Sequence, residues 1–179
     1  MTVAQADLSA EFLEMPEGLR IDRPEVADGA ALWRIAKDSR TLDLNSSYSY
    51  LLWCRDFAGT TAVARDTDGR PVGFVTAYAR PERPRTLLVW QVAVDATHRG
   101  KGLAARLLDG LTARVAAERG LSAVETTITP GNTASERLFT SYARRHGAAV
   151  EREVLFGTAQ FPDGPHDPEV LYRIGPFSA

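Results

Sequence analysis

The sequence predicts an α/β fold of the α+β type, in which a single mixed, mostly antiparallel sheet is flanked by helices. Segments with helical periodicity alternate with strand-like segments near both ends of the chain, and two strand-like segments joined by a turn at 66–69 lie in the middle. Helices between strands favour parallel neighbours, whereas a hairpin requires antiparallel ones. A sheet of mixed direction therefore fits this order better than an all-parallel sheet.

The first elements follow an N-terminal arm, residues 1–17, which shows no clear period and is predicted to be mobile. Residues 18–179 are predicted to form a single domain. The elements expected next are a strand over 19–22, a helix over 24–39, a second helix that polar residues precede and that ends near Phe57, a hairpin of strands 60–65 and 72–79, and a strand over 87–94. The proline-containing segment 80–85 is predicted to be a loop that continues neither neighbouring strand. The nearly continuous apolar run 87–94 is typical of a central strand with both faces covered.

The second half of the chain alternates helices and strands. The expected elements are a helix over 101–119 that Gly120 ends, a strand over 123–128, a helix that ends at Gly147, a strand over 150–156, a loop over 157–168 and a strand over 169–174 that closes the sheet. Either Asn132 or Thr133 can cap the helix before Gly147, and Thr133-Ala-Ser-Glu136 has the spacing of a capping box.

The composition limits the class of partner. A formal net charge of −2 argues against nucleic acid, since domains that bind it are usually markedly basic, and it favours a small-molecule partner. No apolar run approaches the ~18 residues that a membrane helix needs, so no membrane partner is expected. The first residues lack the pattern of a secretory signal, and the lone Cys54 cannot form an internal disulfide, which together indicate the cytoplasm. Cys54 lies in an apolar helical pattern that favours a buried inert thiol over a nucleophile.

The stretch 90–105 combines an apolar strand, a short loop rich in Arg, Gly and Lys, and the start of a helix. A helix N-terminus presents unpaired N–H groups and the positive end of its dipole, and Gly100 and Gly102 allow a phosphate to approach the backbone. The stretch therefore predicts an anion site. The alternative for the two glycines is a tight turn without a ligand.

Two motifs carry a resemblance to a known superfamily. Arg99-Gly-Lys-Gly102-Leu-Ala104 fits an R-x-x-G-x-A signature, and Asn132-x-x-Ser135-x-x-Leu138-Phe139 stands in the place of an Asn-x-x-Ala-x-x-Leu-Tyr helix. On these motifs residues 19–147 resemble the GCN5-related N-acetyltransferase (GNAT) superfamily. The resemblance implies the GNAT fold and a loop that holds the pyrophosphate of acetyl-CoA, without a metal.

The resemblance to the GNAT superfamily also implies how the coenzyme is held. In that superfamily the main chain of the strand before the loop bonds the pantetheine arm and polarises the acetyl carbonyl, as an oxyanion hole does. The coenzyme residues implied in this way are Val92, Ala93, Val94, Arg99, Gly100, Lys101, Gly102, Leu103, Ala104 and Asn132. For Asn132, a helix cap without a coenzyme contact is a nearly equal alternative.

Four blocks over nearly the whole chain carry a closer resemblance, namely 42–50, 90–94, 126–132 and 161–174. They are similar to a narrower family, the L-2,4-diaminobutyrate acetyltransferases of ectoine biosynthesis. This resemblance implies that a homodimer transfers the acetyl group of acetyl-CoA to the N4 amine of L-2,4-diaminobutyrate. Ectoine is an osmoprotectant, so a role in osmoprotection is implied as well.

The chemistry of such a substrate needs anions. An amine with a pKa of about 10 is cationic at pH 7. The site must therefore attract the cation and then remove a proton from it before the nitrogen can attack the thioester. By motif position Asp43, Trp90 and Glu169 are implied substrate contacts, and the two carboxylates are also the candidates for catalysis. Tyr48, Tyr50 and His166 are secondary candidates for the same pocket. Without the resemblance, each residue has a structural alternative: Asp43 could be a helix cap, Trp90 a core residue and Glu169 a solvated residue at the end of a strand.

The donor of a proton to the leaving thiolate is not settled by the motifs. Phe139 stands where many GNAT enzymes carry a tyrosine for this purpose, and Tyr142 is the catalytic candidate on the same helix. Alternatively, the thiolate of CoA, whose thiol has a pKa of about 8.5, leaves with help from water. No cysteine lies in a site motif, so direct attack in a ternary complex is expected. For the carboxylate of the substrate, Arg40 is the candidate.

Two other functions remain compatible with the sequence. One is a GNAT acetyltransferase that acts on another small amine or a polyamine. The other is a non-catalytic acyl-CoA sensor, for which the coenzyme would bind without turnover of any amine.

Overall fold

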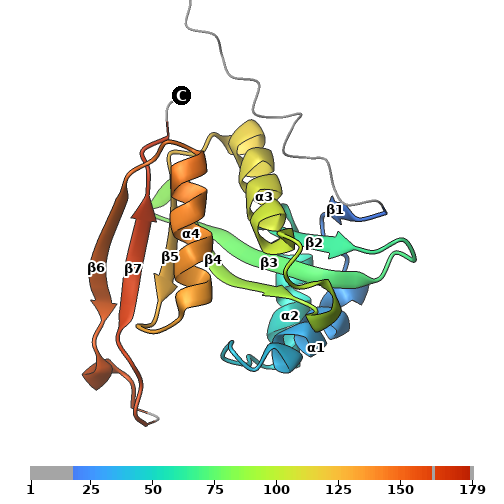
Figure 1. The fold of residues 1–179 in the computed structure, drawn as a ribbon, viewed down its shortest axis with the longest axis horizontal. Coiled ribbons are helices and arrows are strands. Elements are labelled where there is room, and N and C mark those ends of the chain that lie inside the picture. Colours follow the sequence, from blue (N-terminus) through green and yellow to red (C-terminus); the bar gives the residue numbers. More distant parts are fainter. Residues whose placement is uncertain (1–17, 163, 178–179) are drawn as a thin grey trace, which may run out of the picture.

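The computed structural model describes residues 18–162 and 164–177, and the predicted N-terminal arm lies outside this part of the chain. Its seven strands form one sheet in the order β1-β2-β3-β4-β5-β7-β6 (Figure 1). The strands are β1 (Arg20–Asp22), β2 (Thr61–Arg65), β3 (Pro71–Arg80), β4 (Arg83–Val94), β5 (Ala123–Ile128), β6 (Val150–Phe156) and β7 (Glu169–Ile174). Every neighbouring pair is antiparallel except β4 and β5, which are parallel. The prediction of a single mixed, mostly antiparallel sheet is confirmed.

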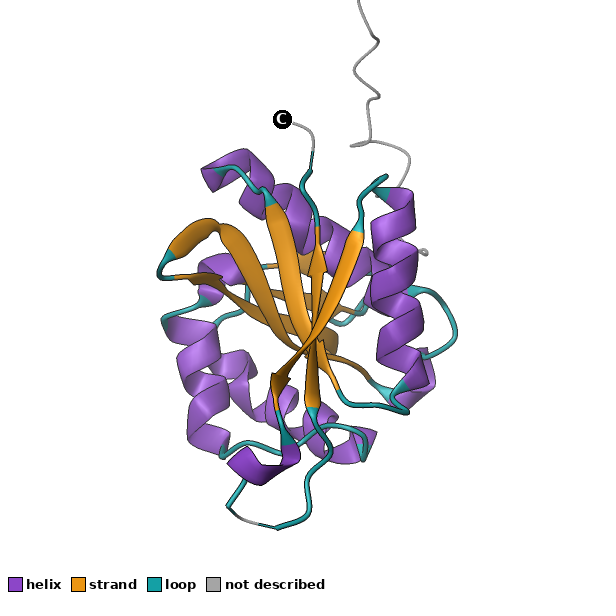
Figure 2. Cartoon of the chain, turned by 90° about the vertical axis from the view of Figure 1, so that its left-hand side faces the viewer, coloured by secondary structure: helices purple, strands orange, loops and turns teal. Residues whose placement is uncertain are grey.

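Helices cover both faces of the sheet (Figure 2). They are α1 (Gly29–Ser39), α2 (Ser47–Arg55), α3 (Leu103–Arg119) and α4 (Thr133–Arg145). Helices α3 and α4 lie on one face, and α1 and α2 lie on the other, against the half of the sheet that contains β3 and β4 (Figure 1). Each of the four expected helices is present. The first begins later than expected because a 3₁₀ turn, Val26–Asp28, precedes it.

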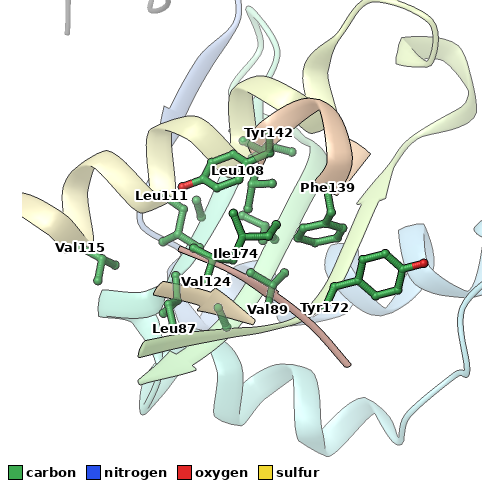
Figure 3. Packing of buried hydrophobic residues seen from close by; sticks show 14 of the residues in the cluster. Leu87, Val89, Leu108, Leu111, Val115, Val124, Phe139, Tyr142, Tyr172 and Ile174 are labelled. Carbon is green, nitrogen blue, oxygen red and sulfur yellow. The ribbon is translucent and has the colours of Figure 1, made fainter. Parts of the chain in front are cut away.

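The core has one apolar cluster on each face of the sheet. On the side of α3 and α4, leucines of α3 such as Leu107, Leu108 and Leu111 pack with Val89 and Val124 from the central strands (Figure 3). Full burial of each leucine contributes about 1.5–3 kcal/mol. The smaller cluster joins α1, α2 and the sheet through Leu32, Ile35, Tyr50, Cys54, Val63, Phe74 and Ala93. Together the two clusters fix both helix layers against β3 and β4.

The expectation of a loop over 80–85 is wrong. Strand β3 continues through Arg80, and β4 begins at Arg83, with which Arg80 pairs across a turn of two residues. Proline is tolerated here because the register between β3 and β4 shifts. Ala79 pairs with Leu87 and Arg80 pairs with Arg83, so Pro84 lies in a stretch of β4 that has no regular partner on β3. Its missing N–H therefore breaks no regular ladder bond.

The first residues of α3, which follows the glycine loop, and of α4, which follows β5, also differ slightly from the expectation. Helix α3 begins at Leu103, two residues after the expected start, with Gly102 as its N-cap at φ 71°. At α4 the cap is Asn132, whose side-chain oxygen accepts a hydrogen bond from the Ser135 N–H at 3.1 Å. The capping box expected from Thr133 is therefore wrong, because Thr133 is already the first helical residue.

A β-bulge at Trp90 reorients the second half of β4. On β3, Thr76 pairs with Gln91 and the next residue pairs with Val89, so Trp90 is an extra residue. Leu87 and Val89 belong to the cluster beneath α3 and α4, and after the bulge Val92 and Val94 pack there instead of falling on the opposite face. The pairing of β4 with β5 also ends at Val89. The bulge thus gives the end of β4 one edge that is not paired with β5.

Candidate active site

A pocket of about 270 Å³ lies beside the end of β4, between the N-termini of α3 and α4. Three parts of the chain that are distant in the sequence form its wall, namely residues within 39–42, 92–104 and 132–138. The lining residues are Ser39, Thr41, Leu42, Val92, Ala93, Val94, His98, Arg99, Gly100, Gly102, Leu103, Ala104, Asn132, Ala134, Ser135 and Leu138.

Nearly all of the residues expected to contact the coenzyme lie on this wall. The exception is Lys101, which is not among the lining residues and whose carbonyl oxygen accepts a hydrogen bond from Arg106 Nη1 at 2.8 Å. Asn132 both caps α4 and lines the pocket, so the two explanations of this residue are compatible.

The glycine loop and the two helix ends give the pocket its electrostatic character. Gly100 and Gly102 have φ angles of 76° and 71°, values that favour glycine, and they turn the chain from β4 into α3. The N-termini of α3 and α4 both line the pocket, so two positive dipole ends and the N–H groups at the start of α3 converge there. This arrangement suits a phosphate or pyrophosphate group.

Two arginine contacts brace the loop against its surroundings. Arg99 Nε donates to the Val94 carbonyl oxygen at 3.1 Å. Asp95 accepts hydrogen bonds from the Thr97 N–H and from Arg34 of α1, both at 3.1 Å. The loop that follows β4 is therefore held by both the strand and α1.

The main chain at the end of β4 is available to a ligand. Val92, Ala93 and Val94 pair with β3 on one side, whereas on the other side the ladder with β5 has already ended. All three residues line the pocket. An extended ligand can therefore lie along this edge as an added strand does, with its hydrogen bonds made to the backbone.

The residues expected to bind the amine form two groups outside the pocket wall. In the first group, Trp90 is 51% exposed and its ring lies 6.2 Å from that of Trp53 on α2. The main-chain oxygen of Asp43 accepts a hydrogen bond from Gln91 Nε2 at 2.8 Å, which brings Asp43 next to β4. Asp43 is not the cap of α2, since Ser46 occupies that position. Tyr48, on α2, is 65% exposed.

The second group lies at the start of β7. His166 Nε2 lies 3.9 Å from Glu169 Oε1, and the His166 ring stacks on Phe161 with 3.8 Å between ring centroids. Strand β7 is antiparallel to β5, which runs parallel to β4. Glu169 therefore lies at the end of the sheet where β4 and β5 terminate, which is also the end that carries the pocket.

Tyr142 lies in the core and is not on the pocket wall. Its side chain is 1% exposed and packs in the cluster of Figure 3 together with Phe139. Burial raises the pKa of Tyr142 to about 12, and the hydroxyl is hydrogen-bonded with Thr112 of α3. A phenol in this position cannot deliver a proton to a thiolate in the pocket. The structure thus does not bring Tyr142 to the site.

Cys54 is buried between α2 and the sheet, as its helical pattern predicts. Burial raises the pKa of its thiol to about 12, and the neighbouring charge of Asp28 acts in the same direction. The thiolate, which is the nucleophilic form, is therefore scarce at neutral pH.

Sequence reasoning missed part of the pocket wall. Ser135 and Leu138 stand in the motif of α4, and His98 precedes the glycine loop, so a local signal existed for these three. The segment 39–42 gave no such signal, because only the packing of α1 against the sheet brings it to β4.

Within residues 18–162 and 164–177, no group of three or more His, Cys, Asp or Glu side chains is placed to hold a metal ion. In the same part of the chain, no helix has the length and apolar character required to cross a membrane.

The pocket and the fold define a class of enzyme. Residues 29–143 match the model of the Acetyltransferase (GNAT) family, and the chain belongs to this family. The motifs and fold that the sequence predicted for a GNAT acetyltransferase are confirmed.

Relatives of higher sequence identity place the chain in a narrower group within the GNAT family. The chain is 82% identical over 178 residues to L-2,4-diaminobutyric acid acetyltransferase of Streptomyces avermitilis, which covers 99% of both chains. It is 70% identical to the enzyme of the same name from Streptomyces coelicolor, over all of this chain and 99% of that one. A solved structure, diaminobutyrate acetyltransferase EctA from Paenibacillus lautus in complex with its substrate L-2,4-diaminobutyric acid and coenzyme A, is similar with a TM-score of 0.84 and 41% identity, over 90% of this chain and 96% of that one. Within the GNAT family the chain belongs to the L-2,4-diaminobutyric acid acetyltransferases.

Proposed function

We propose that this protein transfers the acetyl group of acetyl-CoA to the N4 amine of L-2,4-diaminobutyrate, which yields N4-acetyl-L-2,4-diaminobutyrate and CoA in ectoine biosynthesis. The observation that carries the proposal is the 82% identity to a diaminobutyric acid acetyltransferase over 99% of the chain. The pocket beside β4 supports it, because a solved neighbour of the same fold holds both diaminobutyric acid and CoA.

The coenzyme would bind along three parts of the pocket. The pyrophosphate lies against Gly100 and Gly102 at the N-terminus of α3, where unpaired N–H groups are available. The pantetheine arm follows the edge of β4 over 92–94. A main-chain N–H on this edge polarises the acetyl carbonyl and stabilises the oxyanion that forms when the amine attacks.

The amine would bind at the end of the sheet that carries the ends of β4 and β5 and the start of β7. Asp43 and Glu169 supply one carboxylate for each ammonium group of the substrate, and Trp90 offers an exposed indole face on which a cation can stack. His166 lies beside Glu169 and can relay a proton between that carboxylate and water. Tyr48 lies nearby in the chain, on the exposed side of α2.

The reaction begins with loss of a proton from the N4 ammonium group to one of the two carboxylates. The neutral nitrogen attacks the thioester carbon and a C–N bond forms. The nitrogen then loses its second proton to water, and the C–S bond breaks with its electron pair going to sulfur. Water can supply the proton to the thiolate, because Phe139 has no acidic proton and the hydroxyl of Tyr142 is buried in the core. Direct attack in a ternary complex fits a chain whose one cysteine is buried with a raised pKa.

A panel of amines tests the proposed function. Initial rates with acetyl-CoA should be highest for L-2,4-diaminobutyrate and much lower for ornithine, lysine, polyamines and peptide N-termini. Equal rates across the panel would favour an acetyltransferase of broader specificity. Coenzyme binding with no turnover of any amine would contradict the proposal and indicate a sensor.

Conservative variants test the two carboxylates. Asp43→Asn and Glu169→Gln each remove one anion without a change of size, so the KM for diaminobutyrate should rise or turnover should cease while the KM for acetyl-CoA stays nearly constant. Asp68→Asn, at an exposed turn that is not part of the pocket wall, is the matched control and should change neither constant. Equal loss for both substrates would indicate misfolding instead.

The protein is proposed to be a cytoplasmic homodimer with a role in osmoprotection. Acetyl-CoA is available in the cytoplasm, and β6 is an edge strand with three consecutive exposed apolar side chains, Val154, Leu155 and Phe156. Exposed apolar edges of this kind favour association. Light scattering after gel filtration should give twice the mass of the chain, and a monomer at micromolar concentration would contradict the proposed dimer.

A further inference from the structure

Gln91 occupies an unusual position for an amide side chain. It follows the bulge at Trp90, pairs across the sheet with Thr76, and is 6% exposed. The bulge turns Gln91 and Ala93 toward the face of α1 and α2, while Val92 faces α3 and α4. A buried amide on this face must find hydrogen-bond partners there or lose stability.

The amide has two partners from different segments. The Tyr50 hydroxyl of α2 donates to Gln91 Oε1 at 2.9 Å, and Gln91 Nε2 donates to the main-chain oxygen of Asp43 at 2.8 Å. The Asp43 carbonyl can only accept, so the amide must present its nitrogen to it. The oxygen then faces Tyr50, whose hydroxyl is the donor that fixes this orientation.

The segment held by Gln91 is the connection between α1 and α2, residues 40–46. It turns at Arg40, the one residue other than glycine with a positive φ, 56°, in the part of the chain that the structure describes. Leu42 packs against the smaller core cluster and lines the pocket. One residue further, Asp43 is tied to the sheet by its bond with Gln91. Different contacts therefore fix the two parts of the connection: packing fixes Leu42 in the pocket wall, and the hydrogen bond with Gln91 fixes Asp43.

We propose that Gln91 is a positioning residue for the amine substrate, which holds Asp43 next to β4 through the hydrogen bond to the Asp43 carbonyl. The inference rests on the proposed function, because it gives Asp43 a task in binding the amine. Gln91 acts through Asp43, and the side chain itself is turned away from the cluster that Val92 and Val94 join. Tyr50, 0% exposed, has the secondary part of setting the orientation of the amide.

Two variants at Gln91 test this inference. Gln91→Met keeps the length of the side chain and removes both hydrogen bonds, so the KM for diaminobutyrate should rise about 10-fold, whereas the KM for acetyl-CoA should stay within about 2-fold. Gln91→Glu keeps the acceptor for Tyr50, but an ionised carboxylate cannot donate to the Asp43 carbonyl. Its defect relative to the parent protein should shrink as the pH is lowered and the new carboxyl group becomes protonated. A role in stability alone would make the free energy of unfolding depend on pH but would leave the KM for diaminobutyrate unchanged.

Thr76→Val is the matched control. Thr76 lies directly opposite Gln91 in the register, and its buried hydroxyl has no hydrogen-bond partner among the described residues. Loss of this hydroxyl should therefore change neither KM. Tyr50→Phe keeps the ring packing on Phe74 and should raise the KM for diaminobutyrate less than Gln91→Met does.

The outcomes separate the inference from the proposed function. Normal turnover of diaminobutyrate by the parent protein, together with an unchanged KM in Gln91→Met or an equal rise of both KM values, would overturn the positioning role alone. No turnover of diaminobutyrate by the parent protein would overturn the proposed function, and with it the role of Gln91. The expected result is a rise confined to the amine, accompanied by a pH-dependent defect in Gln91→Glu.

Discussion

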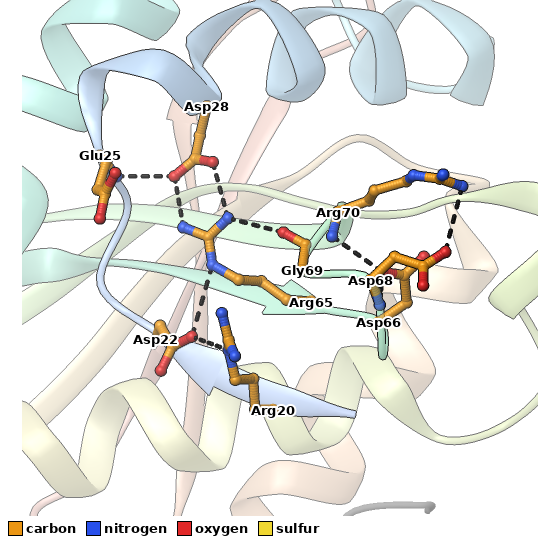
Figure 4. Close-up of polar contacts among 9 residues, drawn as sticks. All are labelled: Arg20, Asp22, Glu25, Asp28, Arg65, Asp66, Asp68, Gly69 and Arg70. Atoms are coloured by element: carbon orange, nitrogen blue, oxygen red, sulfur yellow. Dashed lines mark hydrogen bonds and ion pairs between the residues drawn. The ribbon is translucent and has the colours of Figure 1, made fainter. Parts of the chain in front are cut away.

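A buried ion pair connects the start of α1 to the sheet, and its removal should destabilise the protein strongly. Arg65, the last residue of β2, donates to both carboxylate oxygens of Asp28, at 2.8 Å and 2.7 Å (Figure 4). The two residues are 8% and 7% exposed. Asp28 also accepts the Glu25 N–H at 2.7 Å, and Arg65 donates to the Gly69 carbonyl. Asp28→Asn would remove the buried counter-charge of the guanidinium and leave it with Asp22, a partly exposed carboxylate 3.4 Å from Arg65 Nε.

The cost follows from burial. Breaking a buried pair by removal of one charge costs about 3–5 kcal/mol, because the remaining buried charge loses its close partner, and the weaker contact with Asp22 offsets only part of that loss. In a protein of this size, 1 kcal/mol corresponds to about 2–4 °C in Tm. The expected decrease in Tm for Asp28→Asn is therefore about 6–20 °C at pH 7.

The pair also makes stability depend on pH. Burial by itself would raise the pKa of Asp28, but the hydrogen bonds from Arg65 and Glu25 and the charge of Arg65 outweigh it, so the pKa is lowered. A carboxyl group with a lowered folded pKa contributes stability above its unfolded pKa of about 3.9, and this contribution is lost as the pH falls through the folded value. The parent protein should lose this part of its stability below about pH 4, and Asp28→Asn should not.

Thermal unfolding followed by circular dichroism at pH 7 and at pH 3–4 measures both effects. Asp68→Asn is the control, since the pair of Asp68 with Arg70 is exposed and its separation is 3.5 Å, so the variant should change the stability by less than about 1 kcal/mol. A Tm for Asp28→Asn within about 2 °C of the parent value at pH 7 would refute the reasoning.

Three further predictions concern the site. Gly102→Ala places a side chain on a residue with a φ of 71°, in the left-handed region, at a cost of about 1–2 kcal/mol. Steady-state kinetics should therefore show a raised KM for acetyl-CoA. The control Gly110→Ala, inside α3, should leave that KM unchanged. Tyr142→Phe should keep kcat within about 2-fold of the parent value. A decrease in kcat of about 100-fold or more would indicate that Tyr142 acts as a proton donor in the reaction. Cys54→Ala should retain activity, and mass spectrometry of the parent protein after incubation with acetyl-CoA alone should show no acetyl adduct on Cys54; a stable adduct would contradict direct transfer.

Local periodicity was sufficient for most of the fold. The apolar face of α3, with Leu107, Leu111 and Val115, and the alternation of β5 are visible in the sequence because each depends only on neighbours along the chain. The segment 80–85 was not predictable in this way. Its prolines oppose a strand locally, but the irregular register between β3 and β4, which makes Pro84 acceptable, depends on pairing between two strands.

The site shows the same division. The glycine loop and the cap at Asn132 are contiguous motifs, and most of the expected coenzyme residues do line the pocket. Tyr142 was placed at the site from its spacing to Phe139, yet residues three apart share a helix face, and on α4 that face is the core. Gln91 stands in the block 90–94, but nothing local indicated its role, because its partners, Tyr50 and Asp43, come from a distant part of the chain.

The position of the acetyl group on the product tests the central claim most directly. L-2,4-Diaminobutyrate should be incubated with the protein and acetyl-CoA carrying a carbon-13 label in the acetyl group, and the product should be examined by two-dimensional NMR for correlation of the acetyl carbonyl with the protons on C4 or on C2. Transfer to the N4 amine in a site formed by Asp43, Trp90 and Glu169 predicts correlation with the C4 protons alone. Acetylation of the N2 amine, or no labelled product, would contradict it.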